Sequence, residues 1–212
     1  LMNAEERLTA INRQIDDLKA QIAAKDTQIA KLEKEIEAKA DKPVITDGPT
    51  GFRFPVNYIA VSVPFSSSHY GTDFGWNSAG GGRNMPLCAI GDGIVDMAGA
   101  TDGGAGNRVR IRIDDKEHGR TWYAIYKHLS KIAVSAGQKV KKGDLIGNMG
   151  ETGDADGEHL HFDLILVPYG QSYTQTPESR AKYSVDPLKY LYAYRDQTVG
   201  DVTDKKYTIK RW

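Results

Sequence analysis

Four of the five histidines in this 212-residue chain stand in segments that could form one chemical centre. His159 and His161 are separated by one leucine, and because successive strand residues alternate between faces, both imidazoles would project from the same face. His69 and Asp73 lie four residues apart on either side of Gly71, whose small size lets the backbone turn so that both side chains converge. Two nitrogens and one oxygen form a donor set typical of hydrolytic zinc, which keeps a fourth position for water.

Each of these two strings has an ordinary interpretation when it is taken alone. An HxH pair on a strand is more often two half-exposed side chains, and HxxxD is more often a surface loop with an incidental carboxylate. As a set they predict a zinc site formed by His69, Asp73 and one histidine of the HxH pair. The other histidine of the pair would remain beside the ion and move protons.

The two remaining histidines differ in their surroundings. His128 follows the aromatic and β-branched run TWYAIYK, so it ends a strand, where a capping role and a functional role are equally consistent with the pattern. His118 lies in the polar run DDKEHGR between two strand-like segments. We interpret His118 as a solvated hairpin residue outside the site.

The order of these motifs resembles that of a known family. HxGxDF, then an aromatic strand leading into HLS, then HLHF is similar to the lysostaphin-type (LytM-like) zinc endopeptidases of bacterial cell walls. The glycine-bounded runs GIVDMAG and GQKVKKGDLIG between the motifs agree with the strand-and-turn framework of that family. The resemblance covers residues 52–192.

This resemblance implies a role for each of five residues. The zinc ligands would be His69, Asp73 and His161, holding one Zn²⁺ per chain. The catalytic histidines would be His128 and His159. We expect His159 to take a proton from the attacking water and His128 to orient that water or stabilise the developing oxyanion, although the two roles could be exchanged. Since all five positions are filled, the resemblance favours an active enzyme.

The spacing of the glycines predicts the fold class. The chain contains 22 glycines, and from residue 51 onward they bracket short apolar runs. This pattern indicates a mainly β fold, an antiparallel β-sheet peptidase domain with little helix. The long glycine-rich segments 75–84, 99–106 and 150–158 are expected to be loops that form a groove above the zinc. Such a groove suits an extended peptide better than a small apolar ligand.

The first forty residues carry a different pattern, an apolar heptad repeat. One heptad position is occupied by Leu8, Ile15, Ile22, Ile29 and Ile36. A second holds Ala4, Ile11, Leu18 and Leu32, with Lys25 and Lys39 interrupting it. This spacing predicts an N-terminal α-helical coiled coil over residues 1–40 and a homo-oligomer, with a parallel dimer favoured. The alternative is an amphipathic helix packed on its own β domain.

The remaining segments complete the expected domain organisation. Residues 41–51, with two prolines and two glycines, read as a linker. The zinc endopeptidase domain is expected over residues 52–192. A C-terminal extension of unknown role follows over residues 193–212, where alternating apolar residues indicate an extra edge strand.

Global properties exclude some classes of function. The chain has 28 basic and 28 acidic residues, so its net charge of zero gives no electrostatic case for nucleic acid as a partner. No apolar run reaches the length of a membrane span, and the first residues already belong to the heptads rather than to a signal peptide. The one cysteine, Cys88, allows no intramolecular disulfide.

The resemblance supplies the expected substrate class. It implies a zinc metalloprotease that cuts peptide bonds in peptidoglycan stem peptides or cross-bridges during cell wall degradation. Such a protein would be extracellular, in the cell envelope or virion-associated, for example as an endolysin of a phage tail. The alternatives are a non-catalytic coiled-coil scaffold that activates other wall hydrolases, and a zinc amidase.

Overall fold

The computed structural model describes residues 11–25, 27–28, 31, 51–75, 83–101, 103–202 and 209. The chain divides into two compact units, Leu1–Val44 and Ile45–Trp212. The expected linker lies outside the described residues except at Gly51, and the predicted domain limits therefore stay predictions.

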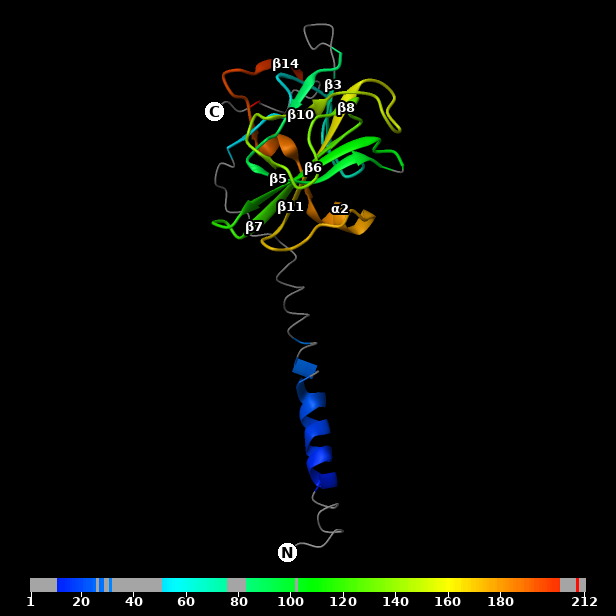
Figure 1. The fold of residues 1–212 in the computed structure, drawn as a ribbon, viewed down its shortest axis with the longest axis vertical. Coiled ribbons are helices and arrows are strands. Elements are labelled where there is room, and N and C mark those ends of the chain that lie inside the picture. Colours follow the sequence, from blue (N-terminus) through cyan, green and yellow to red (C-terminus); the bar gives the residue numbers. More distant parts are fainter. Residues whose placement is uncertain are drawn as a thin grey trace, which may run out of the picture. The chain divides into compact units, whose positions relative to one another are not determined.

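The first unit contains the predicted N-terminal helix. Residues 11–25 are α-helical, and Figure 1 draws this helix in blue. Its heptad positions carry large apolar side chains that are 42–60% exposed: Ile11, Ile15, Leu18 and Ile22. Among the described residues, no helix combines the length and apolar character that a membrane crossing requires. The pairing of this helix into a coiled coil stays a prediction.

The second unit is mainly β, as predicted (Figure 1). The largest sheet in the described part of the chain runs in the order β14 (Thr198–Val202), β2 (Tyr58–Val63), β3 (Thr72–Gly75), β11 (His159–Pro168), β7 (Arg120–Lys127), β6 (Asn107–Asp115), β5 (Gly93–Ala100) and β9 (Lys139–Val140). Strand β12 (Ser184–Val185) also pairs with β11. Neighbouring strands are antiparallel except for β14 and β2.

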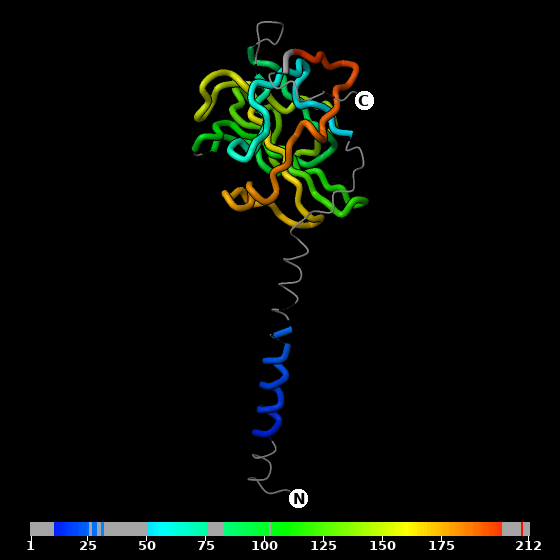
Figure 2. Tube along the Cα trace, turned by 180° about the vertical axis from the view of Figure 1, so that it is seen from behind, coloured from blue at the N-terminus to red at the C-terminus, as the bar shows by residue number. Residues whose placement is uncertain are grey.

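Two smaller sheets lie in the described residues of this unit. The first has the antiparallel order β4 (Pro86–Cys88), β10 (Leu145–Asn148) and β8 (Lys131–Ile132). The second pairs β1 (Phe52–Arg53) in parallel with β13 (Leu191–Tyr192). Figure 2 shows the orange and red C-terminal part of the unit beside the cyan segment that begins it. Strand β14 thus adds an edge strand from within the C-terminal extension.

The two faces of the large sheet differ along strands β7 and β11, because successive side chains of a strand point to opposite faces. Trp122 and Tyr126 of β7 and Phe162 of β11 are fully buried in the main hydrophobic core on one face. The opposite face carries a smaller apolar cluster: Tyr123, Ile125, Ile165, Val167 and Tyr173. Further along the same face of β11, towards its start, stand the two histidines of the HxH pair.

The strand-rich pattern does not predict helix α2 (Pro177–Tyr183), which lies beyond β11 in sequence. The hydroxyl of Thr176 accepts a hydrogen bond from the backbone N–H of Ser179 at 3.1 Å, and a proline begins the helix. This threonine–proline start is a recognisable helix signal. A short 3₁₀ helix, η1 (Pro187–Lys189), follows.

Candidate active site

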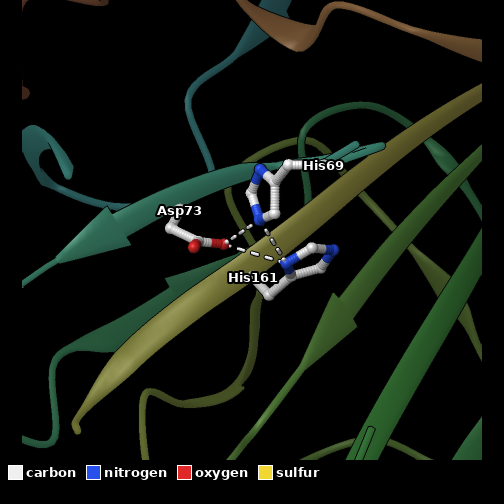
Figure 3. Close-up of side chains that lie close together, drawn as sticks. All are labelled: His69, Asp73 and His161. Atoms are coloured by element: carbon white, nitrogen blue, oxygen red, sulfur yellow. Dashed lines mark hydrogen bonds and ion pairs between the residues drawn. The ribbon is translucent and has the colours of Figure 1, made fainter. Parts of the chain in front are cut away.

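The three predicted ligands converge because two neighbouring strands bring them together. In the antiparallel pair β3 and β11, Asp73 lies directly opposite His161, so the two side chains share one face of the sheet. His69 precedes β3 at the end of a turn that is closed by backbone hydrogen bonds with Ser66, at 2.9 and 3.2 Å. Figure 3 shows the two imidazoles and the carboxylate pointing toward one point.

The spacing of the three donor atoms fits a single tetrahedral ion. Nε2 of His69 lies 3.1 Å from Nδ1 of His161, and Oδ1 of Asp73 lies 3.2 and 2.9 Å from these two nitrogens, respectively. A zinc ion with ligands at about 2 Å would separate neighbouring donors by roughly 3.3 Å. Oδ1 of Asp73 is also buried and makes no hydrogen bond of normal geometry. These residues fit a zinc ion.

The outer ring nitrogens fix which atoms face the centre. Nδ1 of His69 lies 3.3 Å from the carbonyl of Pro64, and Nε2 of His161 lies 2.7 Å from Oδ1 of Asp163. A carbonyl and a carboxylate can only accept, so these ring nitrogens donate, and the inner nitrogens of both rings carry lone pairs. Two lone pairs and the carboxylate oxygen of Asp73 therefore face one another at about van der Waals distance or closer, an arrangement that a cation would stabilise.

Asp163 is a positioning residue that the motif analysis missed. It is almost fully buried, and its second oxygen pairs with Nζ of Lys127 at 2.7 Å. His159, His161 and Asp163 occupy every second position of one strand, so their side chains point to the same face. The sequence could therefore have predicted a third polar side chain on this face. Gly71 leaves room for the pair, since a Cβ there would lie 2.6 Å from Nε2 of His161 and 2.7 Å from Oδ1 of Asp163.

The local electrostatics favour positive charge between the predicted ligands. Burial acts to raise the pKa of Asp73, yet the contacts with His161 and His69 lower it well below its usual range. Burial acts to lower the pKa of His161, yet hydrogen bonding to Asp163 and the interaction with Asp73 raise it. Both shifts describe a position where a proton or a metal ion is stabilised.

The two predicted catalytic histidines form a second group beside the first. The His128 ring centroid lies 4.8 Å from that of His159 and 6.1 Å from that of His161. Nδ1 of His128 donates to the Thr152 carbonyl at 2.9 Å, and Nδ1 of His159 donates to the Gly157 carbonyl at 2.8 Å. Each Nε2 consequently carries the lone pair. Burial lowers the pKa of His128, which keeps this ring neutral near pH 7.

His128 also has an unusual backbone conformation. Its φ of 63° lies in the left-handed region, which costs about 1–2 kcal/mol for a residue with a Cβ. Its backbone N–H donates to the Ala105 carbonyl at 3.0 Å, which helps to hold this conformation. Strained residues of this kind occur preferentially at functional sites. His118, by contrast, pairs with Asp115 at 2.8 Å in the β6–β7 turn and lies outside the group, as predicted.

A cleft of about 780 Å³ opens over the predicted ligands and both other histidines. Its wall includes four carboxylates from the segment before β11: Glu151, Asp154, Asp156 and Glu158. Arg83 and Gly75 also line the cleft. A mainly β unit with this cleft, an N/N/O donor cluster and two adjoining histidines has the arrangement of a metallopeptidase.

Comparison with known proteins gives the family. A family model described as Peptidase family M23 matches residues 67–174, just over half of the chain. The chain therefore belongs to peptidase family M23. The matched range includes all five residues that sequence analysis assigns to the site.

Curated relatives match the same region. The glycyl-glycine endopeptidase ALE-1 of Staphylococcus capitis is 38% identical over 110 residues, which is 52% of this chain and 28% of that protein. The peptidoglycan DD-endopeptidase ShyA of Vibrio cholerae is 43% identical over 98 residues, 46% of this chain and 20% of that protein. The chain thus spans about a quarter of the length of the curated relatives it matches.

Solved structures support the fold. A crystal structure from Pseudomonas aeruginosa that is assigned to peptidase M23 superposes with a TM-score of 0.51 at 24% identity. The superposition covers 77% of this chain and 61% of that one. It extends the agreement in fold beyond the range that the family model matches.

Proposed function

We propose that this chain is a zinc-dependent endopeptidase that hydrolyses peptide bonds in the stem peptides or cross-bridges of peptidoglycan. The observation that carries the proposal is the convergence of two imidazole lone pairs and a buried carboxylate oxygen within 2.9–3.2 Å of one another. His69, Asp73 and His161 would hold the ion. The named activities of the two relatives, on glycyl-glycine bonds and on peptidoglycan, support the substrate class.

A zinc ion held by these residues would supply a Lewis acid and lower the pKa of a bound water toward neutrality. The proton of the attacking water is accepted by His159, whose Nε2 lone pair is available because Nδ1 already donates to a carbonyl. His159 then gives that proton to the leaving amine as the peptide bond breaks. His128, whose Nε2 also carries a lone pair, orients the water by accepting a hydrogen bond from it, and Nε2 donates to the developing oxyanion only once it has taken up a proton.

The cleft over these residues supports a peptide substrate. It is open, and most of the side chains that line it are polar, so they can form hydrogen bonds with the backbone of an extended peptide. We place the peptide in this cleft, along the described segment 150–158, and the groove expected from the glycine-rich loops stays a prediction. Peptidoglycan lies outside the membrane, so the proposed activity places the protein in an extracellular, cell-envelope or virion-associated setting.

The N-terminal helix is proposed to join copies of the chain. Its exposed apolar stripe would be covered in a parallel coiled coil, forming a homo-oligomer. Such a coil would present several peptidase units together on an insoluble substrate, which strengthens attachment through multivalency.

The test combines zinc content with loss of turbidity of purified peptidoglycan from several wall chemotypes, for wild type and His159→Ala. We expect stoichiometric zinc in both proteins and lysis by the wild type alone. Zinc without lysis of any wall would instead favour the non-catalytic activator. New amino termini within the peptides identify an endopeptidase, whereas release of whole stem peptides from glycan would identify an amidase.

A further inference from the structure

The guanidinium of Arg108, on β6, is a half-buried charge without an anionic partner in the described part of the chain. Its Nε and Nη2 lie 3.0 and 2.6 Å from the thioether sulfur of Met97, and Nη1 donates to Oε1 of Gln175 at 2.8 Å. A thioether is a weak acceptor and an amide is neutral. Arg110, two residues further along the strand, is instead paired with Asp96 at 2.8 Å.

A second guanidinium reaches the same region from helix α2. Nε of Arg180 is buried and makes no hydrogen bond of normal geometry. An Nη atom of Arg180 lies 3.9 Å from Asp163, but that carboxylate already contacts Lys127 and His161 at 2.7 Å each. One carboxylate is thus shared between the ammonium of Lys127 and the guanidinium of Arg180, so positive charge is left in excess.

These side chains line a hollow that reaches the candidate active site. Two adjoining cavities of about 400 and 710 Å³ share Arg108, Gln175 and Arg180. The smaller cavity is also lined by His128 and His161, and the larger by Tyr173. Tyr173 is 4% exposed, and its hydroxyl, which lies beside the side chain of Ser179, makes no hydrogen bond of normal geometry. We call the region around Arg108, Tyr173, Gln175 and Arg180 the arginine cleft.

The arginine cleft has the opposite charge to the cleft on the other side of the candidate site. His128 and His161 line both hollows, so they stand at the boundary. Beyond them on one side lie the four carboxylates of the segment before β11, and on the other side lie the two guanidiniums. A substrate carboxylate would be repelled from the first side and attracted to the second.

We propose that the arginine cleft is a subsite for a carboxylate of the substrate peptide, bound by Arg108 and Arg180 with a hydrogen bond from the hydroxyl of Tyr173. A planar guanidinium can bind a carboxylate through two parallel hydrogen bonds, which fixes the orientation of the ligand. The peptide would therefore cross the site with its carboxylate-bearing side toward helix α2. This inference rests on the proposed peptidase function and deepens it by naming a specificity determinant.

The test uses full-length zinc-loaded protein and a cross-linked wall peptide that the wild type cleaves. The peptide is prepared in three forms: with free carboxylates, with an amidated C-terminus, and with an amidated acidic side chain. We expect one of the two amidations to lower wild-type kcat/KM roughly 10- to 100-fold, mainly through KM, as for loss of a charged hydrogen bond. The amidation that has this effect identifies the carboxylate that is bound.

Arg108→Gln should lower kcat/KM for the free-carboxylate peptide by a similar factor. For the amidated peptide that the wild type cleaves poorly, kcat/KM of the variant should stay within about twofold of the wild-type value. Arg108→Lys should restore part of the loss, since it keeps the charge without the planar geometry. Arg112→Gln is the matched control. Arg112 lies on the same face of β6, pairs with Asp114 at 3.3 Å and should leave all three peptides unaffected.

Two results would overturn the subsite. One is a wild type that cleaves all three forms equally, and the other is an Arg108→Gln variant that loses activity equally on carboxylate and amide. If the wild type cleaves no wall peptide, the proposed function fails separately. Calorimetric binding of the three forms to zinc-loaded His159→Ala then decides the subsite, with weaker binding of an amide expected and equal binding contradicting it.

Discussion

The candidate site has two halves that the fold holds by different means. Strand register fixes Asp73 opposite His161, a buried carboxylate lies behind the ring of His161, and a turn before β3 holds His69. The rings of His128 and His159 instead hydrogen-bond to backbone carbonyls at their outer nitrogens. The first half concentrates negative charge and lone pairs at one point, whereas the second half presents one ring nitrogen of each histidine to a cleft.

This difference shows how one sheet can provide both a site that holds an ion and a site that moves protons. A site that holds an ion needs donors at fixed spacing, which the pairing of β3 with β11 provides. A site that moves protons needs imidazoles that exchange between two states near neutral pH. His159 and His161 are two residues apart, yet only the latter has a carboxylate behind its ring among the described residues.

The largest effect is expected from the first half. His161→Ala should lose zinc and reduce peptidase activity by roughly 1,000-fold or more, because several kcal/mol of transition-state stabilisation depend on the ion. Zinc content by mass spectrometry and cleavage of wall peptides measure the two losses. A variant that retains full zinc would show that the ion is held elsewhere.

The second half should respond differently. His159→Ala and His128→Asn are expected to lower kcat roughly 100- to 10,000-fold while zinc content stays at the wild-type value, since these rings transfer or orient protons. Asparagine is chosen at position 128 because it tolerates the left-handed backbone there. Loss of zinc in either variant would contradict the claim that His128 and His159 take no part in binding the ion.

A smaller effect is expected from the carboxylate behind His161. Asp163→Asn keeps the shape of the side chain but removes its charge, so zinc affinity should fall about 10- to 100-fold. Competition with a chelator measures this affinity. Asp114→Asn, on the exposed end of β6, is the matched control and should leave affinity unchanged. Equal affinity in Asp163→Asn would mean that strand register alone orders the ligands.

The smallest effect on chemistry is expected from the first unit. Deleting residues 1–40 should change cleavage of soluble peptides by no more than about twofold, because the described site residues all lie in the second unit. The same deletion should lower the oligomeric state, measured by sedimentation. Sedimentation as the same oligomer would rule out the coiled coil, and a large loss of activity would show that the helix takes part in the site.

The sequence predicted the parts of this site that follow from local periodicity. Alternation along HLHFDLIL placed Leu160, Phe162 and Leu164 in the main core, and it placed the histidines on the opposite face. It could not reveal that Lys127 would pair with Asp163, since this contact depends on the register between β7 and β11. The arginine cleft could not be predicted from the sequence either. Arg108 and Arg180 are 72 positions apart, and they line the same cavity only because of how α2 is placed in the fold.

The most direct test of the central claim is the position of zinc in a crystal of the zinc-loaded protein, located by anomalous scattering at the zinc edge. We expect one peak about 2 Å from Nε2 of His69, Nδ1 of His161 and Oδ1 of Asp73, with His128 and His159 outside the coordination sphere. A peak between His128 and His159, or no peak at the three predicted donors, would contradict the division of the site into an ion-binding half and a proton-moving half.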